Sequence, residues 1–151
     1  MIVLQFACGT DFTSKAIDWF SHGWWSHVDA VLPDGRLLGA RFSGGVAIRP
    51  ADYLGTTKIQ QVNLPCSDDM SAKFYEFLNT QVGKAYDKTA IAAFIFNRDW
   101  QNPKDWYCSE LQASGLVTCG YLPHKLAIPN NKITPSDLYF LLSGLVDIPS
   151  N

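Results

Sequence analysis

The chain has 151 residues, of which 47% are hydrophobic and 17% are charged. This size and composition are ordinary for one globular domain with a buried core, and they exclude an intrinsically disordered chain. The formal net charge is −2, and lysine and arginine are scattered singly, so the sequence provides no basic surface for nucleic acid. We therefore expect a single domain over residues 1–151 and no nucleic-acid partner.

The apolar start of the chain predicts a central strand over residues 2–7. It has no basic flank, and polar Gln5 interrupts it, whereas a signal peptide needs a charged leader and a longer apolar region. No stretch approaches the roughly 18 apolar residues that a membrane span requires. The sequence thus favours a cytoplasmic protein without a membrane span, and it leaves release by another factor open.

The rest of the first half predicts a β-meander behind one short helix. That helix covers residues 16–20, with Asp11, Thr13 or Ser14 as its cap and Gly23 at its end. Period-two alternation begins at residue 24, and the Pro33-Asp34-Gly35-Arg36 turn indicates a hairpin. The strands expected here cover residues 24–32, 37–42, 46–48 and 56–64.

The second half is mainly helical in pattern. Apolar residues at helical spacing predict helices over Met70–Leu78, Thr89–Phe96, Trp106–Thr118 and Ser136–Leu145, the last with Thr134 or Ser136 as cap. Strands that precede most of the helices are typical of the α+β class. We therefore expect a largely antiparallel sheet or partial barrel packed against helices.

The cysteine pattern predicts neither a metal site nor a disulfide. Cys8, Cys66, Cys108 and Cys119 form no CxxC pair. If Cys108 and Cys119 share one helix, they lie about 16 Å apart, which exceeds the limit of about 7 Å between the Cα atoms of a disulfide. Reduced thiols and no cofactor are the simpler expectation.

Cys108 is the candidate nucleophile. The sequence Asp105-Trp-Tyr-Cys108 predicts Asp105 as the helix cap and Cys108 in the first helical turn. There the free amides and the helix dipole favour a thiolate, and the same amides can receive an oxyanion. Gly115, further along the helix, is expected to allow close approach to a sheet. The alternative is that Cys108 is a buried structural cysteine, a common role for this residue type.

His27 is the candidate base. It lies on a predicted strand, and Asp29 follows two residues later on the same strand face, so a base and an orienting carboxylate lie side by side. Val28 and Ala30 face the other way. The alternative is that His27 and Asp29 are solvated residues on the outer face of an antiparallel strand.

Taken together, these segments resemble the circularly permuted relatives of the NlpC/P60 family, including the YiiX-like proteins. The resemblance rests on the order of several short motifs between about Gly9 and Gly120. These motifs are Asp11-Phe12-Thr13-Ser14, Ser26-His27-Val28, Gly44-Gly45-Val46, Gly83-x-x-Tyr86-Asp87 and Tyr107-Cys108-Ser109-Glu110-Leu111.

The resemblance implies a papain-like fold in which Cys108 is the nucleophile and His27 is the general base and then the general acid. Many relatives carry a Glu-Ala pair on the strand after the histidine strand, where this chain has Gly39-Ala40. Because glycine cannot orient an imidazole, Asp29 is the replacement candidate. A main-chain carbonyl or a water molecule is the alternative.

These residues predict a cysteine hydrolase that cleaves an amide through a thioester acyl-enzyme. The resemblance implies a peptide or a bacterial cell-wall-related amide as substrate, in a protein of bacterial or phage origin. Two alternatives remain: a lipid-acting thioesterase or acyltransferase on the same fold, and a binding module without catalysis. The sequence does not indicate the oligomeric state. Tyr107, Tyr86 and Trp25 are candidate substrate-binding residues, and each has a purely structural alternative in the core.

Overall fold

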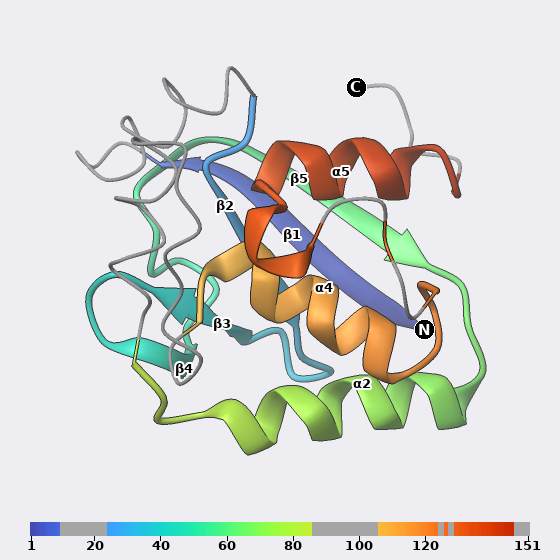
Figure 1. Ribbon diagram of the computed structural model, residues 1–151. Helices are drawn as coiled ribbons and strands as arrows, with labels where there is room; N and C mark the ends of the chain where they lie inside the picture. The colour runs from blue at the N-terminus through green and yellow to red at the C-terminus, as the bar shows by residue number, and fades with distance from the viewer. Residues whose placement is uncertain (10–23, 86–105, 124–125, 127–128, 147–151) are drawn as a thin grey trace.

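The structure, a computed structural model, describes residues 1–9, 24–85, 106–123, 126 and 129–146 (Figure 1). An antiparallel sheet and a set of helices make up this part of the chain, which confirms the α+β class. The predicted helices over residues 16–20 and 89–96 lie outside the described residues.

The strands form one five-stranded antiparallel sheet with the order β4-β3-β2-β1-β5. The predicted strands are confirmed, and the first of them lies inside the sheet between β2 and β5. The bounds are β1 Ile2–Gly9, β2 His27–Val31, β3 Leu37–Arg41, β4 Gly45–Arg49 and β5 Thr56–Leu64.

The hairpin between β2 and β3 follows the chemistry of its turn. Gly35 has a φ of 83°, a left-handed conformation that glycine adopts without a steric penalty. The backbone N–H of Leu32 donates to the carbonyl of Arg36 at 2.8 Å and closes the turn. This turn sets the register in which Ala30 pairs with Leu38, and so it determines which residues of β2 and β3 are neighbours.

The described helices are α2 (Asp68–Gln81), α4 (Cys108–Thr118) and α5 (Pro135–Ser143), with a 3-10 turn over Asn130–Lys132. α2 is longer than predicted because the Ser67 side chain accepts from the N–H of Met70 and caps an earlier first turn. α5 begins after Thr134, whose side chain accepts from the N–H of Asp137. Of the two caps expected for this helix, Thr134 is confirmed.

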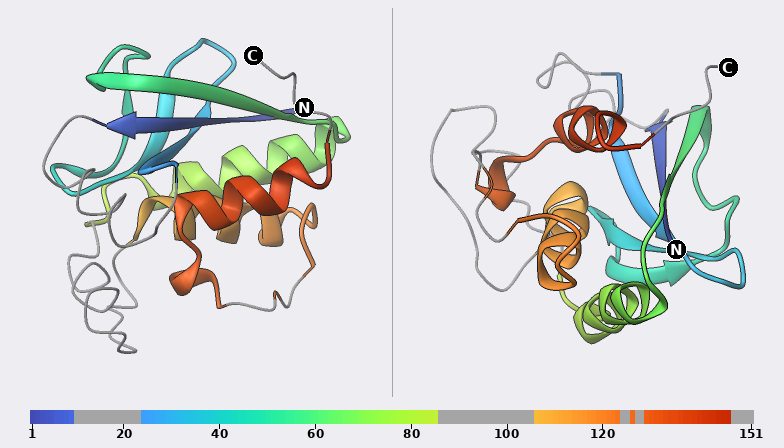
Figure 2. Two further views of the ribbon diagram at one scale, coloured as in Figure 1. Left: turned by 90° about the horizontal axis from the view of Figure 1, so that it is seen from above. Right: turned by 90° about the vertical axis from the view of Figure 1, so that its right-hand side faces the viewer.

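The helices cover one face of the sheet, as the view from above in Figure 2 shows. Alternate residues of β1 and β2 point into the core between the layers, and Phe6 pairs with Val28 across the two strands. α4 contacts β2, β3, α2 and α5. The helix that carries Cys108 is therefore in contact with the strand that carries His27.

Gly115 provides close contact between α4 and α2, not between α4 and the sheet. A Cβ atom at this position would lie 2.9 Å from Cε2 of Phe74 and 3.4 Å from Cδ2 of Leu78, both on α2. The expectation that Gly115 faces the sheet is thus wrong, because the helix turns this position toward its helical neighbour.

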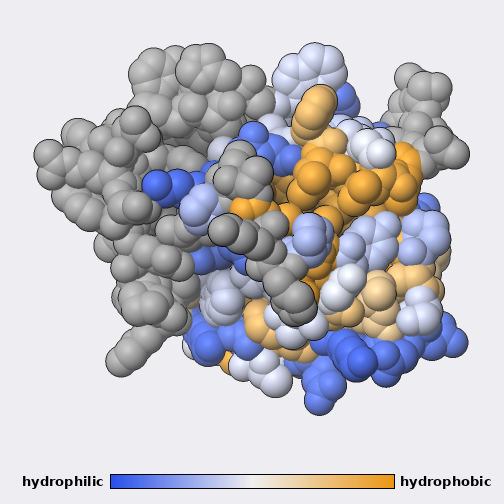
Figure 3. Space-filling view, turned by 45° about the vertical axis from the view of Figure 1, so that its right-hand side comes forward, coloured by the Kyte–Doolittle hydropathy of each residue, from blue (hydrophilic) through white to orange (hydrophobic). Residues whose placement is uncertain are grey.

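The outer face of α5 is apolar. Apolar side chains gather over this helix in the face shown in Figure 3; Phe140 and Leu141 of α5 are exposed, as is Leu145 just after its end. The inner face of the same helix places Leu138 and Leu142 in the core. α5 is thus apolar on both sides, although it lies at the surface.

Candidate active site

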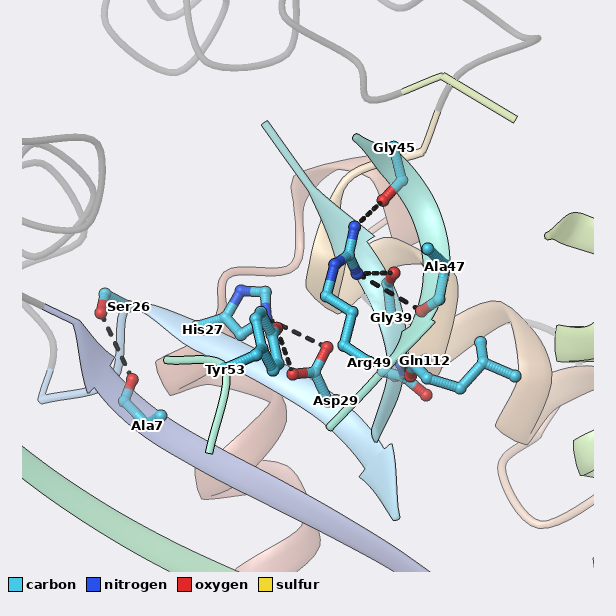
Figure 4. A network of polar contacts seen from close by, with 11 residues as sticks. Ala7, Ser26, His27, Asp29, Gly39, Gly45, Ala47, Arg49, Tyr53 and Gln112 are labelled. Atoms are coloured by element: carbon cyan, nitrogen blue, oxygen red, sulfur yellow. Dashed lines mark hydrogen bonds and ion pairs between the residues drawn. The ribbon is translucent and has the colours of Figure 1, made fainter. Parts of the chain in front are cut away.

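His27 and Asp29 lie side by side on β2, and both are buried. Nε2 of His27 is 3.0 Å from Oδ1 of Asp29 (Figure 4). Their exposed fractions are 6% and 1%, which excludes the alternative that they form a solvated strand face. The alternation of the strand predicts this shared face, and the structure confirms it.

A third side chain, Tyr53, contacts both His27 and Asp29. Its hydroxyl donates to Oδ2 of Asp29 at 2.6 Å and lies 3.0 Å from Nε2 of His27. Tyr53 comes from the segment between β4 and β5, and sequence reasoning missed it. A tyrosine in a loop has no periodic relation to a strand, so only its place in the folded chain reveals the contact.

The β3–β4 hairpin fixes Arg49 beside Tyr53. The guanidinium donates to the carbonyls of Gly39, Ala47 and Gly45 at 3.0, 3.3 and 2.8 Å. Its Cζ atom lies 5.3 Å from the centroid of the Tyr53 ring, within the range of a cation–π contact. Figure 4 shows the guanidinium turned toward the hairpin carbonyls.

Gly39 makes room for the Asp29 carboxylate. A Cβ atom at position 39 would lie 1.8 Å from Oδ1 of Asp29, far inside van der Waals contact. Position 39 therefore carries no side chain, and the carboxylate of the neighbouring strand occupies the space beside it.

The hydrogen bonds around His27 indicate which of its ring nitrogens carries a proton. Tyr53 has one hydroxyl proton, and the carboxylate of Asp29 accepts it. Nε2 of His27 must therefore donate, to Oδ1 of Asp29 and to the Tyr53 oxygen. We assign the neutral ring as protonated on Nε2, with the lone pair on Nδ1.

Cys108 begins α4, is fully buried, and lies close enough to the His27 ring to raise its pKa. Because Asp29 and Tyr53 occupy Nε2, we assign the thiol to the Nδ1 edge. The structure thus brings together His27, Asp29 and Cys108. Gln112, one helical turn after Cys108, donates to the carbonyl of Leu38 at 3.1 Å and attaches α4 to β3.

His27 and Asp29 each favour the charged form of the other. Burial alone would lower the pKa of His27, but the charge and hydrogen bond of Asp29, followed by the hydrogen bond and charge of Cys108, raise it from 6.5 to about 10. Burial alone would raise the pKa of Asp29. His27, the Tyr53 hydrogen bond and the Arg49 charge outweigh this effect and lower it. The favoured state is an imidazolium beside a carboxylate.

Tyr53 remains protonated in this surrounding. Burial raises the pKa of its hydroxyl, and the charge and hydrogen bond of Asp29 raise it further. The hydroxyl is therefore a permanent donor to Asp29 and does not compete with His27 as a base.

The start of α4 differs from the prediction. The helix begins at Cys108 with Tyr107 as the N-cap residue, so the expectation that Asp105 caps it is wrong. The N–H of Trp106 donates to the carbonyl of Ala85 at 3.0 Å, and this bridge holds Trp106 outside the helix. The Glu110 carboxylate accepts the N–H of Tyr107 at 3.4 Å. Cys108 still lies in the first turn, as predicted.

The structure places the candidate substrate-binding residues in different surroundings. Tyr107 is fully buried at the start of α4. Trp25 is 3% exposed and packs against the rings of Phe6 and Tyr139, so the core surrounds it. Tyr86 lies outside the described residues.

No family model matches the chain, and no curated protein matches it either. Within the described ranges, no group of three or more His, Cys, Asp or Glu side chains is placed to hold a metal ion. In the same part of the chain, none of the helices combines the length and apolarity that a bilayer crossing requires.

Proposed function

We propose that the protein is a cysteine hydrolase that cleaves an amide bond through a thioester acyl-enzyme. The observation that carries this proposal is the contact of Asp29 with Nε2 of His27, on a strand packed against α4, whose first residue Cys108 lies close enough to raise the pKa of the ring. A nucleophile, a base and a group that orients the base are the parts that this chemistry needs.

Before the acylation step, the thiol proton has already passed to Nδ1 of the His27 imidazolium, so Cys108 attacks the amide carbon as a thiolate. The carbonyl oxygen becomes an oxyanion, which the amide groups of the first turn of α4 stabilise because that turn has no intrahelical acceptor for them. The imidazolium then donates its proton to the leaving nitrogen. The carbon–nitrogen bond breaks, an amine leaves, and a thioester remains on Cys108.

In the deacylation step, His27 takes a proton from water, and the resulting hydroxide attacks the thioester carbon. The carbon–sulfur bond breaks, the proton returns to the sulfur, and a carboxylic acid leaves. Asp29 stabilises the imidazolium in both steps without taking its proton. The balanced reaction consumes one water molecule for each amide.

The arrangement of the chain supports a permuted papain-like fold of the NlpC/P60 type. The histidine strand precedes the cysteine helix, and α4 packs on the sheet beside β2. The resemblance of the motifs points to a peptide or cell-wall-related amide as substrate.

Thiol labelling tests the proposal. If accessibility alone sets the labelling rate, Cys66 should react before Cys108; if Cys108 is activated, the order should be reversed. Cys66 is partly exposed, whereas Cys108 is fully buried. With iodoacetamide at pH 7 and peptide mass spectrometry, we expect Cys108 to label at least tenfold faster than Cys66, because a thiolate is the nucleophile. His27→Ala should abolish this advantage and leave the rate at Cys66 unchanged.

Faster labelling of Cys8, Cys66 or Cys119 in the folded protein would contradict the assignment of the nucleophile. Intact mass spectrometry with amide and thioester substrates then separates the activities. An acyl adduct on Cys108 that water releases indicates a hydrolase, whereas transfer to an added amine or alcohol indicates an acyltransferase. Binding without any adduct indicates a binding module.

A further inference from the structure

We propose that Tyr53 is a positioning residue of this site, whose hydroxyl holds Asp29 against Nε2 of His27 and so reserves the Nδ1 edge for Cys108. The inference rests on the proposed function and extends it to a residue outside the Cys-His-Asp set.

The geometry shows why Asp29 needs a second partner. Two side chains at i and i+2 of a strand leave the same face nearly parallel, so neither is aimed at the other. The terminal torsion of an aspartate is also broad, and its carboxylate has no strongly preferred rotation. The Tyr53 hydroxyl binds Oδ2 at 2.6 Å, which leaves Oδ1 turned toward the ring at 3.0 Å.

The same hydroxyl also contacts the ring directly. Its oxygen lies 3.0 Å from Nε2 and accepts from the Nε2 proton, while its own proton goes to Asp29. Tyr53 thus uses its donor on the carboxylate and its acceptor on the imidazole. A phenylalanine in its place would remove both bonds and keep the ring.

The position of Tyr53 is itself fixed by two cations. The guanidinium carbons of Arg41 and Arg49 each lie 5.3 Å from the centroid of its ring. Three carbonyls of the β3–β4 hairpin hold Arg49. The hairpin thus positions Arg49, Arg49 contacts the Tyr53 ring, and the Tyr53 hydroxyl binds Asp29.

Tyr53→Phe tests the proposal, and Tyr75→Phe is the matched control. Tyr75 also has a bridging hydroxyl, which donates to the carbonyl of Val31 at 2.7 Å and accepts from the N–H of Val3 at 3.3 Å. Both variants lose two hydrogen bonds next to the same sheet, but only one variant changes the surroundings of His27. Urea unfolding of both variants confirms that each is folded before the comparison.

The readouts are the NMR titration of the His27 ring from pH 5 to 10.5 and the pH profile of Cys108 alkylation. In Tyr53→Phe we expect the midpoint of His27 to fall by about one pH unit, a tenfold loss of proton affinity. The step in the pH profile of Cys108 alkylation that reflects loss of the His27 proton should move down by the same amount. Tyr75→Phe should leave both readouts at their wild-type values.

A double variant shows whether Tyr53 acts through Asp29. If it does, adding Tyr53→Phe to Asp29→Asn should change the midpoint of His27 little. If the two residues act independently, the shifts of the two single variants should add. An unchanged or raised midpoint in Tyr53→Phe, or an equal shift in Tyr75→Phe, would overturn the proposal. The titration reports on Tyr53 even if Cys108 labels no faster than Cys66, so failure of the proposed function is a separate result.

Discussion

Replacing Asp29 by asparagine removes one charge from the buried pair with His27 and leaves the shape of the side chain unchanged. The pKa of His27 rises from 6.5 to about 10 in the folded protein, with Asp29 as the strongest raising influence. This rise corresponds to roughly 5 kcal/mol of stability, as an upper limit that Asp29 and Cys108 share. We expect Asp29→Asn to lower the free energy of unfolding at pH 6 by about 3 kcal/mol.

The effect should depend on pH in a defined direction. Because the folded pKa of His27 is raised, its contribution to stability is fully present below pH 6.5 and is lost as the pH rises through about 10. Asp29 has a lowered pKa, so its contribution is present above the ordinary value of 3.8 and is lost in more acid solution. The pair therefore stabilises the fold most between about pH 4 and 6.5.

Urea unfolding followed by tryptophan fluorescence at pH 6 and at pH 10 measures this effect. Both proteins should carry Cys108→Ser, so that the thiol does not titrate in either. We expect the difference of about 3 kcal/mol at pH 6 to shrink below about 1 kcal/mol at pH 10, because the pH has then reached the raised pKa of His27 and nearly all of its contribution is lost. Equal differences at the two pH values would refute the ion pair as the source of the stability.

Two glycines provide further tests by urea unfolding. Gly39→Ala should cost about 3 kcal/mol, because its Cβ would lie 1.8 Å from Oδ1 of Asp29 and break the contact with His27. The cost should be much smaller in an Asp29→Ala background, and an equal cost there would contradict the clash. Gly115→Ala should cost about 1 to 2 kcal/mol despite the better helix propensity of alanine, because its Cβ would lie 2.9 Å from the Phe74 ring. A gain in stability would show that the ring moves aside freely.

Local patterns in the sequence predict the strands and most of the helix positions. Alternation on β2 places His27 and Asp29 on one face, and the Asp34-Gly35 turn sets the pairing of that strand with β3. These features depend on neighbours a few residues apart, which the sequence shows directly. The register of β2 against β1 depends on long-range packing and comes only from the folded chain.

The parts that the sequence does not reveal depend on contacts between distant segments. Tyr53 reaches Asp29 across 24 positions of the chain, and no spacing predicts that contact. The start of α4 moves from its expected place because Trp106 pairs with the distant Ala85. A good capping residue at position 105 cannot compete with a backbone bridge that holds the next residue in an extended form.

The contact between Gly39 and Asp29 links the evolutionary histories of the two positions. A descendant of this chain that gains a side chain at position 39 by one mutation collides with Asp29 and loses the orientation of His27. The carboxylate can move from one strand to the other only through an ancestor with a small residue at both positions. Natural relatives are therefore expected to carry either aspartate with glycine or a small residue with a larger acid, so that the two sites are inherited as a pair.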